Sequence, residues 1–289
     1  MNLLHTGLRV SLASLLLLAG SISARAQISF VDLYHTNVLS QTADGSAGVS
    51  YNYSYAGLDL FSQTANEYTT VQTFYPGAGS PVTLANDDPN DATHYEYSAS
   101  FTSQNAMNTA FPTGTYSYAA NGGGPSATTM INYANDAYPA TQPYLAGTTY
   151  SSLQGMNSAA SFTFQLSPFT KDASATSAYI FLNIFNSLTG NVVFSANFLS
   201  PSTTSVSMPA NTLQPGTAYV FDLDYSDRVL VSSPGADYDA TLGFDIRTDG
   251  NFTTAIPEPA VSLFVLAGIG AFLLRRVKKG RTIAASLRK

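Results

Sequence analysis

The chain of 289 residues has no cysteine and no tryptophan. The missing cysteine excludes disulfides, cysteine metal sites, cysteine nucleophiles and c-type haem attachment, even where export would permit disulfides. Long amphipathic helices are also missing between the two hydrophobic ends, because no stretch there keeps an apolar period of about 3.6 residues. We therefore expect a fold that is stabilised by its hydrophobic core alone and is not a helical bundle.

Basic residues are almost missing from the middle of the chain. Residues 27–255 contain three of them, Lys171, Arg228 and Arg247, against 17 of the 18 acidic residues, which gives a formal net charge of −14. The value of −6 for the whole chain hides this, because the other nine basic residues lie near its two ends. An acidic surface disfavours nucleic acid and anionic membranes, and is compatible with divalent cations or neutral glycans.

What the middle does contain is tyrosine and phenylalanine, 18 and 17 in the whole chain, with many Ser, Thr, Asn and Gly residues. This composition is typical of extracellular β-proteins, since aromatic residues and Thr suit pleated surfaces and Gly and Asn suit turns. Alternating apolar positions predict strands at residues 160–166, 178–185, 191–199, 217–225 and 240–247, and less regularly at 49–55, 68–75, 94–102 and 113–119. A short helical turn is predicted at 104–110. We expect a mainly β ectodomain, an antiparallel β-sandwich of one large or two tandem units.

A short Gly-Thr-(x)-Tyr step occurs three times, ending at Tyr116, Tyr150 and Tyr219. In each copy Gly allows a turn, Thr begins a strand, and the tyrosine hydroxyl can reach backbone. The third copy, residues 213–219, resembles the tyrosine-corner segment of fibronectin type III domains and so supports a sandwich. Two tandem units would divide near residues 138–143, giving a β-rich domain at 27–140 and a β-sandwich domain at 141–255.

Catalytic residues are scarce in this middle part. The only histidines are His35 and His94, no G-x-S-x-G elbow occurs, and no H-E-x-x-H motif occurs. His94 and Glu96 share one face of a predicted strand. Asp222 and Asp224 share another, with Asp237 and Asp239 following, and two such acids could serve a glycosidase. We interpret these residues as ordinary polar or acidic strand faces, so we expect a protein that is not an enzyme.

Calcium is the one cofactor that the acidic residues suggest. Two clusters offer carboxylate oxygens, Asp87, Asp88 and Asp91 in the first and Asp222, Asp224 and Asp227 in the second. Neither matches an EF-hand loop, and the alternative is carboxylates that merely repel one another. Tyr51, Tyr53 and Tyr55 alternate along one predicted strand and could stack on sugars, although an aromatic stripe at this spacing also suits a core.

The N-terminal residues 1–26 have the pattern of a secretory signal peptide. Arg9 gives the positive region, residues 10–22 the apolar region, and Ala24 and Ala26 the small-residue cleavage site, so Gln27 is the expected mature N-terminus. The secretion translocon and signal peptidase are the implied partners. The alternative is an uncleaved N-terminal helix.

The C-terminal end has the pattern of a membrane stop. Pro257, Glu258 and Pro259 precede an uncharged apolar run at residues 260–274. A basic cluster follows, formed by Arg275, Arg276, Lys278, Lys279 and Arg281. The run can cross lipid as a single transmembrane helix, while the basic cluster stays cytoplasmic. It is short for a bilayer, so a buried core helix is the alternative.

The order of Pro-Glu-Pro motif, short hydrophobic helix and basic cluster resembles the PEP-CTERM sorting signal of Gram-negative envelope proteins. The resemblance covers residues 256–281 and implies processing by an exosortase, a membrane-embedded cysteine protease-transpeptidase. It also implies a transient inner-membrane anchor and association with exopolysaccharide or biofilm matrix. Residues 282–289 depart from the usual pattern, because they extend past the basic stop as a cytoplasmic tail.

Together these features predict an exported, non-enzymatic cell-surface or extracellular-matrix protein that is sorted through its C-terminal signal. The alternative is a secreted glycan-binding or glycan-hydrolysing β-sandwich protein. An exposed cleft of Tyr and Asp side chains would favour the alternative, and burial of the same side chains in a core would exclude it.

Overall fold

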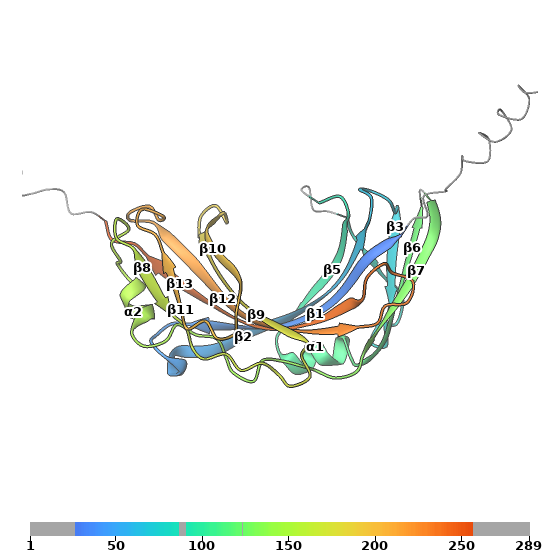
Figure 1. The fold of residues 1–289 in the computed structure, drawn as a ribbon, viewed down its shortest axis with the longest axis horizontal. Helices are drawn as coiled ribbons and strands as arrows, with labels where there is room; N and C mark the ends of the chain where they lie inside the picture. Colours follow the sequence, from blue (N-terminus) through green and yellow to red (C-terminus); the bar gives the residue numbers. More distant parts are fainter. Residues whose placement is uncertain (1–26, 87–90, 123, 257–289) are drawn as a thin grey trace, which may run out of the picture.

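A computed structural model describes residues 27–86, 91–122 and 124–256 of the chain, and its largest element is a curved sheet of seven strands (Figure 1). The strand order is β10-β9-β12-β13-β1-β2-β5. The strands are β1 (Ile28–Gln41), β2 (Val49–Ser62), β5 (His94–Phe101), β9 (Ser177–Asn186), β10 (Val192–Leu199), β12 (Ala218–Val231) and β13 (Ala240–Thr253). The prediction of a mainly β protein is therefore confirmed.

Two smaller sheets and three short helices complete the described part of the chain. The four-stranded sheet has the order β4-β3-β6-β7 and the two-stranded sheet pairs β11 with β8. Their strands are β3 (Thr70–Phe74), β4 (Val82–Leu84), β6 (Gly114–Gly122), β7 (Gly124–Tyr133), β8 (Phe162–Gln165) and β11 (Ser205–Met208). The helices are η1 (Ser46–Gly48), α1 (Gln104–Ala110) and α2 (Thr149–Leu153).

The seven-stranded sheet differs from the predicted antiparallel arrangement in one pairing. β1 and β13, near the two ends of the described chain, lie side by side in parallel, with Asp32 opposite Thr241 and Ser40 opposite Asp249. Every other pair in this sheet is antiparallel. Local alternation cannot reveal this pairing, because it joins segments about two hundred residues apart and needs the whole intervening chain to fold.

Both hydrophobic cores lie on the same face of the seven-stranded sheet. Along β12, Tyr219, Phe221, Leu223 and Tyr225 belong to one core, and Val229 packs against the other. Since alternate residues of a strand share a face, these odd-numbered positions mark one covered face. One core lies against β3, β6, β7 and α1, the other against β8, β11 and α2. In Figure 1 the two α-helices lie on the convex side of the sheet, and no described element covers the concave side.

In two of the three Gly-Thr-(x)-Tyr copies, the tyrosine hydroxyl forms a hydrogen bond with backbone a few residues earlier in the chain. The hydroxyl of buried Tyr219 accepts a hydrogen bond from the Gln214 backbone N–H (2.8 Å), as a tyrosine corner does. The hydroxyl of buried Tyr116 donates to the Pro112 carbonyl (2.9 Å). Tyr150 instead lies in α2 and its hydroxyl donates to the distant Asn251 carbonyl (3.3 Å).

The expected boundary near residue 140 falls inside this architecture. Strands from both sides of it share the seven-stranded sheet, whereas each core draws most of its residues from one side. Independent folding of the two halves stays a prediction. Across the described ranges, no helix has the length and apolar character that crossing a bilayer requires. The predicted signal peptide (1–26), sorting segment (257–281) and tail (282–289) lie outside those ranges.

Candidate functional site

The concave side of the seven-stranded sheet gathers most of its charged side chains. We call this surface the open face and define it by the strand positions that alternate with the core positions. Two of the three basic residues of the body, Arg228 and Arg247, lie on it. Register places the following residues there: Asp32, Tyr34, Thr36, Tyr53, Tyr55, Asp59, His94, Glu96, Tyr179, Phe181, Asp222, Asp224, Asp245 and Asp249.

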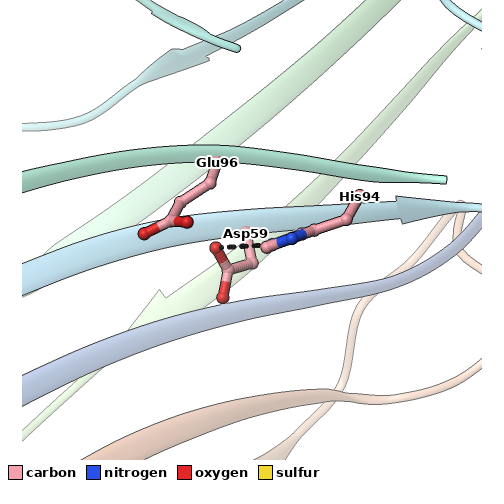
Figure 2. A group of neighbouring side chains, drawn as sticks. All are labelled: Asp59, His94 and Glu96. Carbon is pink, nitrogen blue, oxygen red and sulfur yellow. Dashed lines mark ion pairs between the residues drawn. The ribbon is translucent and has the colours of Figure 1, made fainter. Parts of the chain in front are cut away.

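Three of these side chains meet at the β5 edge of the sheet (Figure 2). Asp59 of β2 lies directly opposite Glu96 of β5, and His94 is two residues before Glu96 on the same face. His94 Nε2 and Asp59 Oδ1 are 3.1 Å apart. Among the described residues, this is the group of three His, Asp or Glu side chains whose ligand atoms all lie within 4.8 Å of one another. The shared face of His94 and Glu96, predicted from alternation, is therefore present.

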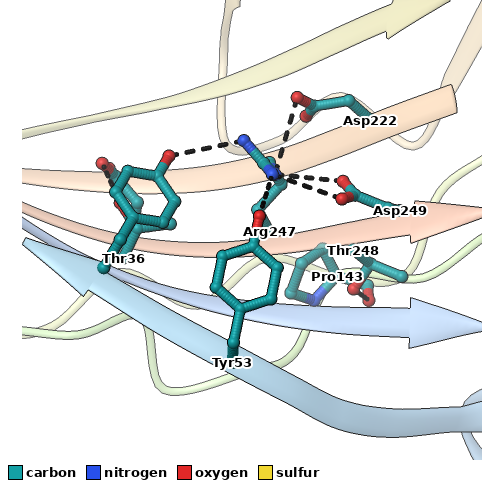
Figure 3. Close-up of polar contacts among 9 residues, drawn as sticks. Thr36, Tyr53, Pro143, Asp222, Arg247, Thr248 and Asp249 are labelled. Atoms are coloured by element: carbon teal, nitrogen blue, oxygen red, sulfur yellow. Dashed lines mark hydrogen bonds and ion pairs between the residues drawn. The ribbon is translucent and has the colours of Figure 1, made fainter. Parts of the chain in front are cut away.

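Arg247 occupies the centre of the open face (Figure 3). Its guanidinium lies between Asp249 of its own strand (Nε to Oδ1, 3.0 Å) and Asp222 of β12 (3.7 Å). It also donates to the Tyr53 hydroxyl of β2 (3.2 Å). Side chains of three strands thus meet at one cation, and those of β2 reach it across β1, which lies between β13 and β2.

A second ion-pair group surrounds Arg228. Its guanidinium is 3.6 Å from Asp245 and 3.9 Å from Asp32, and the Thr36 hydroxyl donates to Asp245 (3.3 Å). Acids still outnumber bases on the open face. Burial, and then the nearby Asp245 and Asp222, raise the pKa of Asp224 well above its ordinary value. The seven carboxyl groups of this face outnumber its two arginines even when Asp224 holds its proton, so the face attracts cations and repels anionic ligands.

Burial also raises the pKa of Asp222 to about 7, against the opposing effect of Arg247. A carboxyl with this pKa exchanges its proton near neutral pH, as a general acid must. Its side chain keeps 16% of its surface exposed, so it is accessible from the open face.

Aromatic rings cover the open face near the β10 edge. Tyr179 and Phe181 of β9 lie opposite Ser226 and Asp224, and the ring of Phe198 contacts both at centroid distances of 5.6 and 5.0 Å. Phe198 is 72% exposed and its backbone has φ of 55°. A non-glycine residue in this left-handed region is uncommon and is often associated with function. Strand alternation alone did not reveal Phe198, because it lies at a register shift of β10.

The structure separates the residues of the second predicted calcium cluster, and the first cluster stays a prediction. In the first, Asp87 and Asp88 lie outside the described residues, and Asp91 accepts hydrogen bonds from the backbone and hydroxyl of Thr93. In the second, Asp222 and Asp224 lie on the open face. Asp227 is an odd-numbered residue on the opposite face, is fully buried and accepts the Asp172 backbone N–H (2.7 Å). Strand alternation separates it from the other two.

The other predicted site residues of the sheet are also divided between its two faces. A bulge in β2 turns Tyr51 away from Tyr53 and Tyr55, and its hydroxyl lies 2.7 Å from Ser54 Oγ. Tyr53 and Tyr55 belong to neither hydrophobic core. His35 is buried on the covered face against the rings of three aromatic residues, Phe111, Tyr133 and Phe244, where burial lowers its pKa to about 4.

Asp237 and Asp239 lie in the connection after β12, beyond the open face. Gln27, the expected first residue of the mature chain, is described, and its backbone N–H donates to Glu67 (2.9 Å). The cleavage residues Ala24 and Ala26 lie outside the described residues, as do the sorting motif Pro257, Glu258 and Pro259 and the basic cluster Arg275, Arg276, Lys278, Lys279 and Arg281.

No protein-family model and no curated protein matches the chain. Among solved structures, it is similar to the FN1–FN3 domains of chicken CNTN1, with 11% identity over 77% of this chain and 65% of that one, and a TM-score of 0.23. It is also similar to the BSP domain of a biofilm associated protein, with 10% identity over 81% of this chain and 30% of that one, and a TM-score of 0.20. The chain thus spans less than two thirds of each of these structures. At these TM-scores neither likeness carries an argument.

Proposed function

We propose that the chain is an exported, non-enzymatic cell-surface or extracellular-matrix protein whose open face binds a neutral polysaccharide. The observation that carries the binding proposal is an aromatic group, exposed Phe198 with half-buried Tyr179 and Phe181, on the same concave face as half-buried carboxyl and guanidinium groups. Export and sorting rest on the two ends of the sequence.

The chemistry of this face suits sugars. Aromatic rings offer flat apolar surface for the C–H faces of a sugar ring, and the neighbouring Asp222, Asp249 and Arg247 offer acceptors and donors for its hydroxyls. The acid surplus disfavours an anionic polysaccharide. Because the sheet is concave, an extended polymer could contact both its β10 and β5 edges.

Affinity electrophoresis of the full chain in gels with neutral glucans or galactomannan tests the binding proposal, with alginate as the acidic comparison. Phe198→Ala removes a ring that is 72% exposed and should weaken retardation by neutral polymer about tenfold while leaving the fold intact. The matched control is Tyr238→Ala, which removes a ring 67% exposed in the connection after β12 and should bind like the wild type. Equal retardation of all three proteins would exclude the open face as the binding surface.

Sorting is tested separately in the native host. Intact mass and cell fractionation of the wild type should give a protein that begins at Gln27, lacks the basic tail and has left the membrane. Replacing Pro257, Glu258 and Pro259 by alanine should leave the tail in place and the protein in the inner membrane. If both proteins keep residues 275–289 in the membrane, the C-terminal segment is a plain anchor and the exosortase is not a partner.

Hydrolysis is the second candidate, favoured by one observation, the pKa of about 7 at Asp222. A hydrolase would release reducing ends from a polysaccharide that binds, and Asp222→Asn would abolish this release without abolishing binding. We expect binding without release of reducing ends.

A further inference from the structure

We propose that Asp59, His94 and Glu96 form a binding site for a divalent transition-metal cation of the Zn²⁺ class at the β5 edge of the open face. The site does not depend on polysaccharide binding, because the three side chains come from a different edge of the sheet from the aromatic group. Their ligand atoms all lie within 4.8 Å of one another (Figure 2).

Backbone register explains why these side chains converge. Asp59 and Glu96 are directly opposite on neighbouring antiparallel strands, a position that places Cβ atoms about 5 Å apart. His94 lies opposite Phe61, one alternate position along the same face. Three potential ligands are thus fixed by two rigid strands rather than by a loop, which favours a preformed site.

The distance between His94 and Asp59 is close to that between two ligands of one cation. The imidazole Nε2 and the carboxylate Oδ1 are 3.1 Å apart, and in this structure they pair with each other. Two ligands of one Zn²⁺, each about 2.0–2.2 Å from the metal, lie roughly 3 Å apart, so a cation could be held by both atoms with little rearrangement.

Neighbouring groups hold the three side chains in place. The Phe61 ring stacks on the His94 imidazole at a centroid distance of 4.5 Å and an interplanar angle of 6°. The Tyr34 hydroxyl donates to Glu96 Oε1 (2.7 Å). Tyr34 reaches it across Gly57, where an added Cβ would lie 2.1 Å from the ring. Outer groups of this kind orient metal ligands and raise affinity.

The donor set decides the class of ion. One imidazole nitrogen with two carboxylates suits Zn²⁺ or Mn²⁺, whereas Ca²⁺ and Mg²⁺ prefer oxygen ligands alone. The side chains of His94 and Asp59 are 19% and 12% exposed, so the site lies close to the surface of the open face. The acid surplus of the same face adds a favourable field for a cation.

Isothermal titration of the untagged, EDTA-treated full chain with Zn²⁺ tests the site, together with X-ray absorption of the zinc-loaded protein. We expect one Zn²⁺ per chain with micromolar or tighter affinity, and one imidazole in the zinc shell. His94→Ala and Glu96→Gln should each weaken binding at least tenfold, and Tyr34→Phe should weaken it about tenfold or less. Asp91→Asn, a carboxylate close in sequence but held by Thr93, is the matched control and should bind like the wild type.

Circular dichroism establishes that each variant is folded. If His94→Ala does not fold, Glu96→Gln keeps the test decisive, because glutamine retains an oxygen that can accept from Tyr34. The absorption spectrum of the wild type is decisive without any variant. Absence of stoichiometric binding, a zinc shell without imidazole, or folded variants that bind like the wild type would each falsify the proposal.

Discussion

The two faces of the seven-stranded sheet use the same strands for opposite purposes. On β12, Phe221, Leu223 and Tyr225 are buried in a hydrophobic core, while Asp222 and Asp224 between them point to the open face. The covered face gains stability by removing apolar surface from water. The open face buries charge instead, at a cost that its two arginines offset in part. Alternation along each strand therefore places most of the apolar burial on one face and the proposed binding chemistry on the other.

The largest expected effect comes from breaking the covered face. Phe221→Ala removes a fully buried ring and should lower the free energy of unfolding by about 3–5 kcal/mol. Phe181→Ala removes the same ring from the half-buried open face and should cost less than about half as much. Urea denaturation of both variants measures the difference, and equal losses would show that the open face is also a core.

The next effect comes from removing the central cation of the open face. Arg247→Gln leaves Asp222 and Asp249 without their ion-pair partner and should cost about 2 kcal/mol at pH 8, since the guanidinium is only 21% exposed. The loss should shrink at pH 5, where Asp222 is protonated in both proteins. Lys171→Gln is the control, because this exposed side chain only contacts backbone carbonyls, and it should change stability by less than about 0.5 kcal/mol.

The pH dependence of stability distinguishes the faces further. Burial raises the pKa of Asp222 from 3.8 to about 7, so between these pH values the folded protein binds this proton more tightly than the unfolded chain. Stability from this group is therefore present at low pH and is lost as the pH rises through the window, by up to about 1.4 kcal/mol per pH unit.

Asp222→Asn should match the wild type near pH 4, exceed it at pH 8, and flatten the fall between them in thermal unfolding scans. Asp172→Asn is the control, because hydrogen bonds from Ser174 lower the pKa of that exposed carboxyl, and its loss cannot flatten the fall. An unchanged pH slope in Asp222→Asn would show that this carboxyl titrates normally.

The smallest expected effect on stability comes from removing one tyrosine hydroxyl from each face. Tyr219→Phe removes a buried hydroxyl from the Gln214 backbone N–H on the covered face and should cost about 1–1.5 kcal/mol. Tyr53→Phe removes one of several partners of Arg247 on the open face and should cost about 0.5 kcal/mol. Denaturant midpoints of the two variants show which loss of unfolding free energy is larger. The loss in Tyr53→Phe would be the larger one if the open face were the more tightly packed.

Much of the fold could be predicted from local pattern. The predicted strand at 178–185 is observed as β9 and that at 94–102 as β5, and the helical turn at 104–110 is observed as α1. The predicted strands at 217–225 and 240–247 begin within one residue of β12 and β13, but each strand continues for several residues. The later part of β12 carries Asp227 and Arg228 on opposite faces, and that of β13 carries Asp249, Gly250 and Asn251, so the apolar alternation used to find strand ends is interrupted.

The candidate site was only partly predictable. Alternation correctly placed Asp222 with Asp224 and His94 with Glu96, because two residues on one strand share a face whatever surrounds them. It could not supply Asp59 or Arg247 as their partners, since those contacts cross between strands. Alternation would also have separated Asp227 from Asp222 and Asp224, but the calcium prediction grouped the three by proximity in sequence.

The sequence by itself determined the acidic, cysteine-free composition, the β-strand periodicity and the residues that share a face, because these are properties of a residue and its near neighbours. Only the tertiary structure decided which face would be covered and which would stay open. That choice depends on β1 and β13 pairing in parallel and on two smaller sheets packing against one side. Such contacts join distant segments, and their free energy is gained only when the whole chain has folded.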